Sequence, residues 1–299
     1  MAAWNLWGDG PGCWIADALA PYHSRERRGL AGSTVAATVP DSFEAYVRIL
    51  HPVVMNTLDI NGTFHFGTTT WADVAAKTGR TIHPAVQFAA ITGLPRGEQL
   101  ILGDQHYGNP IEGRLEPFAL AALADVVGRF TSTPGDVYLA IWDGWGGLHE
   151  GTSVSYVPAA EEGAAATAAQ IQEAFDLALR QMQLRGLSEE MLDSSMVDVA
   201  NGYRCFYVER STIAGLAAPP WNGEALPQFT QSPNLAWPED RAWCLATEID
   251  FDSTLVGGSR ELIAAIVAHP GLEALPVELA TDLAWHADTV NPLPGDSGG

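Results

Sequence analysis

Three carboxylates recur at every second position of one short segment: Glu248, Asp250 and Asp252. They fall in residues 243–252, where apolar and acidic side chains alternate and so predict a β-strand with one acidic face. Neighbouring carboxylates on such a face would stand roughly 6.5–7 Å apart, near the lower end of the separation found in inverting glycosidases. Such a face could bind a metal, carry out acid–base chemistry or simply contact water.

If the protein is an enzyme, these three residues are its candidate catalytic groups, and a hydrolase acting on a glycoside or a phosphoester is expected. The phosphoester alternative comes from Ile249–Val256, which resembles the first motif of haloacid dehalogenase-like phosphatases, where an aspartate attacks phosphorus. That family also needs a later lysine, and the one lysine of this chain, Lys77, precedes the motif. The glycoside alternative is favoured by ten tryptophans, which could stack on sugar rings.

A second set of candidate residues combines tryptophan, arginine and carboxylates, side chains of the kind found at binding hot spots. Its members are Trp142, Asp143, Trp145, Trp237, Glu239, Asp240 and Arg241. The first three follow a predicted strand, and the last four connect a proline-rich loop, residues 217–238, to the acidic segment. The alternative is a local salt bridge from Arg241 to Glu239 or Asp240, with Trp237 packed inward.

The chain carries 36 acidic and 15 basic residues, a formal net charge of −21. Affinity for nucleic acids and for anionic membranes comes from clustered Lys and Arg, so neither partner is expected. A basic protein partner is compatible with this charge, because the net field of a protein steers oppositely charged molecules toward it. We therefore expect an acidic, non-catalytic protein-binding protein of the toxin-neutralising immunity type, with the hydrolase as the alternative and the oligomeric state open.

Neither a metal nor a cofactor is predicted. The three cysteines are widely spaced, the eight histidines are dispersed, and the patterns of zinc, calcium, nucleotide and dinucleotide sites are missing. The N-terminal residues lack the basic and apolar regions of a signal peptide, and no apolar run reaches the length of a membrane span. These patterns predict a cytoplasmic protein.

The order of predicted elements indicates an α+β fold, a single domain with a mixed or antiparallel sheet and flanking helices. Strands are predicted at 136–142, 203–208 and 243–252, and helices at 42–51, 70–79, 117–130, 161–185 and 259–268. A short helical turn is expected within 84–91. The predicted organisation is an irregular N-terminal arm at 1–40, the domain at 41–290 and a disordered tail at 291–299.

Four segments resemble a group of uncharacterised actinobacterial proteins: 43–52 (FEAYVRILHP), 71–75 (WADVA), 141–146 (IWDGWG) and 233–258. The resemblance runs over most of the chain, and the last segment is the most specific. It implies a bacterial cytoplasmic protein. It implies no activity, cofactor or catalytic residue.

Overall fold

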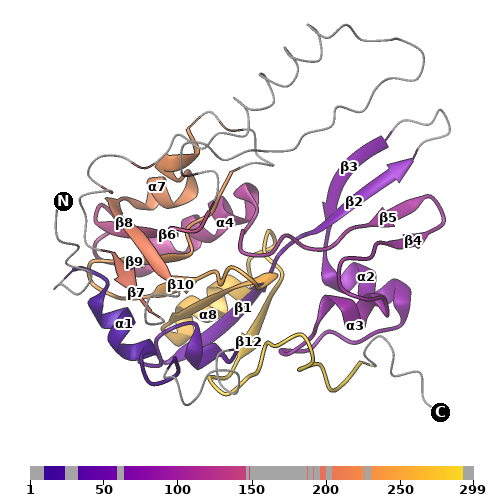
Figure 1. The fold of residues 1–299 in the computed structure, drawn as a ribbon, viewed down its shortest axis with the longest axis horizontal. Helices are drawn as coiled ribbons and strands as arrows, with labels where there is room; N and C mark the ends of the chain where they lie inside the picture. The colour runs from indigo at the N-terminus through magenta and orange to yellow at the C-terminus, as the bar shows by residue number, and fades with distance from the viewer. Residues whose placement is uncertain are drawn as a thin grey trace, which may run out of the picture.

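Two antiparallel sheets and their helices form the fold (Figure 1). The computed structural model describes residues 10–23, 33–58, 64–145, 148, 187, 191, 196–199, 204–223, 225 and 230–291. The predicted helix at 161–185 and residues 292–299 of the predicted tail lie outside this range. No helix in the described part of the chain is long and apolar enough to cross a membrane.

The larger sheet has eight strands in the order β12-β1-β11-β10-β9-β6-β8-β7. Every neighbouring pair in it is antiparallel. The strands are β1 (Ala45–Leu50), β6 (Val137–Trp142), β7 (Val197–Asp198), β8 (Cys205–Ser211), β9 (Leu235–Pro238), β10 (Cys244–Ala246), β11 (Ser253–Gly258) and β12 (Ala274–Val277).

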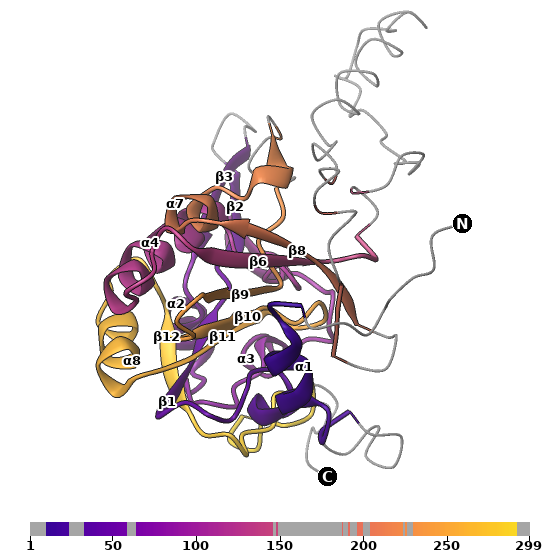
Figure 2. The same ribbon diagram turned by 90° about the vertical axis from the view of Figure 1, so that its left-hand side faces the viewer.

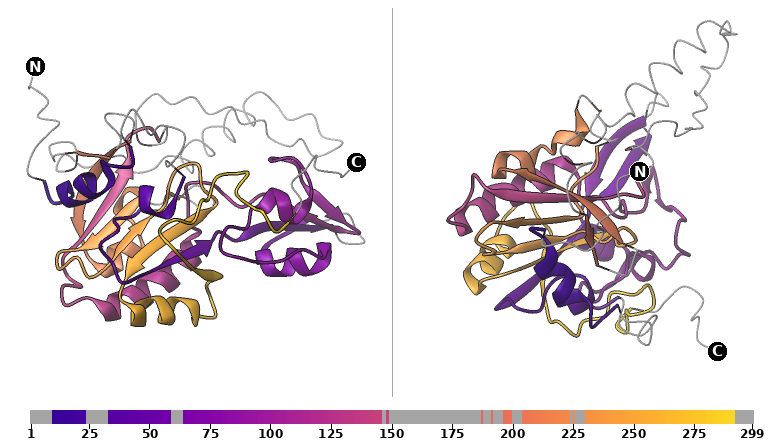
Figure 3. Two further views of the ribbon diagram at one scale, coloured as in Figure 1. Left: turned by 90° about the horizontal axis from the view of Figure 1, so that it is seen from below. Right: turned by 60° about the vertical axis from the view of Figure 1, so that its left-hand side comes forward.

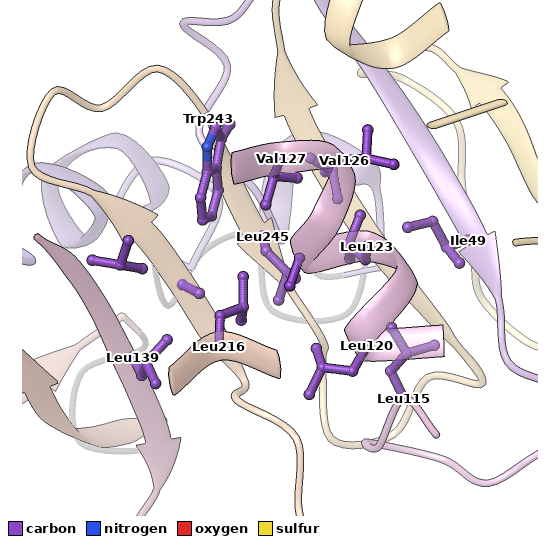
Figure 4. Packing of buried hydrophobic residues seen from close by; sticks show 14 of the residues in the cluster. Ile49, Leu115, Leu120, Leu123, Val126, Val127, Leu139, Leu216, Trp243 and Leu245 are labelled. Atoms are coloured by element: carbon purple, nitrogen blue, oxygen red, sulfur yellow. The ribbon is translucent and has the colours of Figure 1, made fainter. Parts of the chain in front are cut away.

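Both faces of the larger sheet are buried, which explains the apolar character of its strands. In and beside β10, Trp243 and Leu245 belong to one core cluster, whereas Cys244 and Ala246 belong to another on the opposite face. The first cluster includes side chains of α4 (Pro117–Val127), α7 (Ile213–Ala217) and α8 (Arg260–Val267), and the second includes Ile15 and Leu19 of α1 (Cys13–Leu19). Figure 2 shows α1 on the opposite side of the larger sheet from α4, α7 and α8. In Figure 4, side chains of α4 and α7 lie over Leu245 in this first cluster.

The smaller sheet has the order β3-β2-β5-β4 and is also antiparallel. Its strands are β2 (Val53–Leu58), β3 (Phe64–Thr69), β4 (Leu100–Leu102) and β5 (Gln105–Tyr107), and its helices are α2 (Trp71–Thr78) and α3 (Phe88–Thr92). Trp71, Val74, Phe88 and Tyr107 form its separate core. Figure 3 shows that the two sheets lie end to end and give the molecule two lobes, a larger and a smaller one. Three short 3-10 helices, Val35–Ala37, Gly128–Phe130 and Pro220–Asn222, complete the described elements.

The two lobes are tied together by backbone and side-chain contacts at their junction. The Glu273 carboxylate, just before β12, accepts hydrogen bonds from the N–H groups of Trp71 and Ala72 at 2.6 and 2.7 Å. These are unpaired donors of the first turn of α2, which a carboxylate satisfies well. Trp71 also donates its indole N–H to the carbonyl of His51 at 2.9 Å.

The structure confirms the predicted α+β fold class, with antiparallel sheets. Helices with local start and stop signals are confirmed: Thr70 caps α2 through the N–H of Asp73, and Ser259 caps α8 through the N–H of Leu262. The helix predicted at 117–130 is α4 with the 3-10 turn that follows it, and the turn expected within 84–91 becomes α3. The strands predicted at 136–142 and 203–208 correspond to β6 and β8.

Residues 42–51 do not form the predicted helix, because Ala45–Leu50 is strand β1. The strand is buried on both faces, so apolar residues occupy consecutive positions on either side of Arg48 and do not alternate. A continuous apolar run fits a helical period as well as a buried strand. The β-branched Val47 and Ile49 favour the strand, and pairing with β11 and β12 fixes it.

The prediction of an irregular arm at 1–40 is wrong for the described part of that segment. Cys13–Leu19 forms α1, with Ile15 and Leu19 buried against the larger sheet. Val35 and Val39 join the same cluster. The glycine-rich composition obscured this helix, which tertiary packing stabilises more than local propensity does.

Candidate functional site

The three candidate catalytic carboxylates lie in a hairpin loop and not on one face of a strand. Residues 247–252 connect β10 to β11. Inside this loop the N–H of Phe251 donates to the carbonyl of Glu248 at 3.2 Å, and the N–H of Asp250 donates to the Glu248 carboxylate at 2.6 Å. Acidic side chains favour such turns because they accept from nearby backbone donors. The predicted acidic strand is therefore wrong beyond Ala246.

The hairpin loop packs closely against the backbone of Gly113. The N–H of Gly113 donates to the carbonyl of Phe251 at 2.8 Å, and Gly113 has a φ of +68°. A Cβ atom at this position would lie 2.7 Å from the carbonyl oxygen of Ile249. Both the left-handed backbone and the close approach require glycine here.

Arg204 contacts both Trp142 and two of the three candidate carboxylates. Its Nε donates to Glu248 at 2.9 Å and its Nη2 to Asp250 at 3.0 Å. The guanidinium carbon lies 5.8 Å from the ring centroid of Trp142, which contacts Trp145 edge to face at 5.6 Å. The sequence-predicted catalytic and binding residues thus meet at this end of β6, with Asp143 next in the chain.

Asp252 pairs with Arg48 of β1. The Arg48 side chain is 1% exposed and donates from Nη2 to Oδ1 of Asp252 at 3.2 Å. Burial raises the pKa of Asp252, and the nearby charge of Glu112 adds to this, although Arg48 acts in the opposite direction. Burial likewise lowers the pKa of Arg48, against the attraction of Asp252. The pair therefore pays a desolvation cost that only good hydrogen bonding offsets.

The other donors of Arg48 connect three segments. Nη1 donates to the carbonyls of Pro84 and Val86 at 3.2 and 2.7 Å, and Nε donates to the hydroxyl of Ser253 at 2.9 Å. Its guanidinium also lies 5.6 Å from the ring centroid of Trp71. One buried cation thus holds β1, the segment before α3 and the end of the hairpin loop in place.

A second buried polar group, His51, contacts the beginning of β11, directly after the hairpin loop. Its Nδ1 lies 2.6 Å from the carbonyl of Ile111, and its Nε2 lies 2.9 Å from the hydroxyl of Thr254. Burial lowers the pKa of His51 to about 3, so the ring is neutral, and these partners assign the proton to Nδ1. Thr254 contacts the hydroxyl of Thr247 at 2.8 Å, which extends the network to the start of the loop.

A cavity of about 840 Å³ lies where the hairpin loop, the smaller lobe and the C-terminal segment meet. Asp250, Phe251 and Asp252 line it from the loop, and Leu283 and Trp285 from the C-terminal segment. This volume is within the range of small-molecule sites. Two of the three predicted catalytic carboxylates therefore face a cavity, whereas Glu248 does not line it.

Arg96 lines the same cavity from the smaller lobe, and Glu112 lines it from the segment that connects β5 to α4. The Nε of Arg96 donates to Glu112 at 2.9 Å, and its Nη2 donates to the backbone carbonyl of Asp250 at 3.2 Å. This ion pair raises the pKa of Arg96, mainly through the hydrogen bond to Glu112. Three carboxylates and one arginine thus surround a largely apolar space.

Two smaller cavities in the described part of the chain offer no comparable chemistry. One of about 320 Å³ lies beside α4 and is lined by no ionisable side chain. The other, of about 430 Å³, lies between α8 and β12, and Arg260 is its one ionisable residue. The 840 Å³ cavity is the better candidate.

The remaining predicted binding residues lie toward the other end of β6, roughly 13–20 Å along the strand from Trp142. Trp237 is buried and stacks on Tyr138 at 5.5 Å, and Tyr138 donates to Glu239 at 2.7 Å. Asp240 accepts from the Ser132 N–H and hydroxyl, and the Arg241 guanidinium lies 5.3 Å from the Trp14 ring. The structure therefore does not bring these four residues to the cavity or to Arg204.

Sequence reasoning missed the site residues Arg48, Arg96, Glu112 and Trp285. Arg48 did leave a signal, because a charged residue inside an otherwise apolar run is informative. The others are far apart in the sequence and carry no motif. In the described part of the chain no group of three or more His, Cys, Asp or Glu side chains could hold a metal ion.

Comparison with protein-family models, with curated proteins and with solved structures found no match. The resemblance to actinobacterial proteins stays a prediction.

Replacing His51 with Gln tests its buried, neutral state. Below pH 6.5 an unfolded chain protonates this ring, whereas the folded chain resists protonation down to a pKa of about 3. His51 therefore lowers the free energy of unfolding by about 1.4 kcal/mol for each pH unit of acidification within that window. Urea unfolding across this range should give His51→Gln a shallower acid dependence than the wild type. The control is His286→Gln at an exposed histidine, and parallel curves for wild type and His51→Gln would contradict the assignment.

Proposed function

We propose that the 840 Å³ cavity is the active site of a carboxylate-based hydrolase, with Asp252 as the general acid. The observation that carries this proposal is a cavity-lining carboxyl whose pKa burial raises, beside two further carboxylates. Hydrolases that cleave glycosidic bonds separate the acid and base roles of two carboxyl groups through such differences in environment.

The hydrogen bond from Arg48 indicates which oxygen of Asp252 carries the proton. A guanidinium only donates, so Oδ1, which faces Arg48, must accept. The proton of the neutral acid then belongs on Oδ2. This oxygen makes no hydrogen bond to another residue in the described structure and is available to protonate a leaving group.

Glu112 or Asp250 would act as the base toward water. Each lines the cavity, and each gives only one carboxylate oxygen to arginine. The second oxygen of each is free to accept a proton from a water molecule.

The charge of the cavity favours a glycoside over a phosphoester. The carboxylates would repel a phosphate group, and Arg96 is already paired with Glu112. An uncharged sugar meets no such repulsion.

Asp252→Asn tests the assignment of the acid. We expect the wild type to hydrolyse at least one of a panel of para-nitrophenyl glycosides, with kcat/KM falling as the pH rises through the pKa of Asp252. The variant should lose about 10²–10⁴-fold in kcat with little change in KM. Asp125→Asn, an exposed aspartate on α4, is the matched control. Activity on para-nitrophenyl phosphate alone, no activity on any glycoside, or an unchanged rate in Asp252→Asn would contradict the proposal.

The second candidate function is the binding of a basic protein partner, as in an immunity protein. Trp142 and Trp145 are partly exposed and lie beside Glu248 and Asp250, with Arg204 between them. A surface of this composition, in a chain with a net charge of −21, supports binding to a cationic protein.

Glu248→Gln tests this second candidate. We expect affinity capture with the purified protein to recover a basic partner whose binding weakens as salt rises. The variant should bind that partner about five-fold more weakly, since a charge pair near the surface contributes on the order of 1 kcal/mol. Glu261→Gln on the exposed side of α8 removes the same charge elsewhere. Equal losses in both variants, or no salt dependence, would count against a specific surface.

A further inference from the structure

Trp285 is the one described tryptophan that is mostly exposed, at 67%. Four others, Trp71, Trp221, Trp237 and Trp243, are fully buried. Trp285 also lines the 840 Å³ cavity. A large aromatic side chain left in water beside a cavity is informative, because exposed apolar surface of this kind commonly marks a binding site.

The segment that carries Trp285 is held firmly on its N-terminal side. Asp282 accepts from the hydroxyl of Ser33 at 2.7 Å and from the N–H of Ala284 at 2.9 Å. The N–H of Leu283 donates to the carbonyl of Ser33 at 2.9 Å, and the carbonyl of Leu283 accepts from Nε2 of Gln87 at 3.2 Å.

The C-terminal side of the segment is held equally well. Asp288 is 3% exposed and accepts from the N–H of Gln87 at 3.2 Å and from Nδ2 of Asn291 at 2.9 Å. Nε2 of His83 lies 2.8 Å from the same carboxylate. Trp285 therefore projects from a turn fixed at both ends, and its position costs little conformational entropy on binding.

Most of the Trp285 side chain stays open to a ligand, because it is 67% exposed. His286 meets the Trp285 ring at an interplanar angle of 76° and a centroid distance of 5.3 Å, so the two rings do not stack. The face of an indole carries negative electrostatic potential and attracts weakly positive C–H groups, such as those on one face of a saturated ring.

The ion pairs in the lining of the 840 Å³ cavity indicate that its ligand is uncharged. Each carboxylate of the cavity already contacts an arginine: Glu112 contacts Arg96, Asp252 contacts Arg48, and Asp250 contacts Arg204. A second cation is therefore not needed for charge balance. The second oxygens of Glu112 and Asp250 are instead acceptors suited to neutral hydroxyl donors.

We infer that Trp285 is the stacking platform for a sugar ring and that the ligand of the cavity is an uncharged oligosaccharide. This inference rests on the proposed active site and names its substrate class. The volume of about 840 Å³ accommodates more than a single ring. The ring stacks on the indole while a hydroxyl group donates to whichever of Glu112 and Asp250 does not act as the base.

Tryptophan fluorescence and calorimetry with cellobiose, maltose and diacetylchitobiose test the inference. At least one of these disaccharides should bind and change the fluorescence, and Trp285→Phe should lose that change while retaining most of the affinity. Trp285→Ala should weaken binding about ten-fold, which corresponds to the free energy of one aromatic stacking contact. Phe118→Ala, at a 52% exposed aromatic on α4, should bind like the wild type.

Separate results distinguish this inference from the proposed hydrolase. Sugar binding that needs Trp285 without any glycoside hydrolysis would refute the hydrolase and support the stacking role. Failure of all three disaccharides to bind, equal binding by Trp285→Ala, or preferential binding of 2-phenylethylamine would overturn the inference. Hydrolysis of glycosides at an unchanged rate in Trp285→Ala would also overturn it.

Discussion

The buried guanidinium of Arg48 is the constraint on which the cavity depends. A cation that is 1% exposed cannot remain in the fold without partners, and Arg48 takes them from two carbonyls before α3, one hydroxyl and one carboxylate. These partners belong to both lobes. Satisfying one charge thus sets how the hairpin loop meets the smaller lobe, and the space left between them is the candidate site.

The distribution of arginine explains how an acidic protein can keep several carboxylates together. Against 36 acidic residues the chain has few cations, yet Arg48, Arg96 and Arg204 all lie around residues 247–252. Each donates to one oxygen of a carboxyl group that lines the cavity and leaves the other oxygen of that group available. Burial raises the pKa of Asp252, as a general acid requires.

Local sequence signals predicted the elements that depend on local contacts. The caps at Thr70 and Ser259 and the proline at position 117 mark helix starts through hydrogen bonds and φ angles within a few residues. β1 was mistaken for a helix because burial on both faces removes the alternation that identifies a strand. Strands β4 and β5 of the smaller sheet were not foreseen, since they have only three residues each. Strands β2 and β3 have six residues each and were missed as well. For the site, the sequence indicated Asp250 and Asp252, but Arg48, Arg96 and Trp285 reach the cavity only through tertiary contacts.

The most direct test of the account is a carbon-13 NMR titration of the Asp252 carboxyl group, assigned by comparison with Asp252→Asn. We expect a pKa above the ordinary 3.8 of an aspartate, because burial and Glu112 outweigh Arg48. A pKa at or below 3.8 would show that Arg48 dominates and that Asp252 is a structural anion, and the proposed acid would then have no basis.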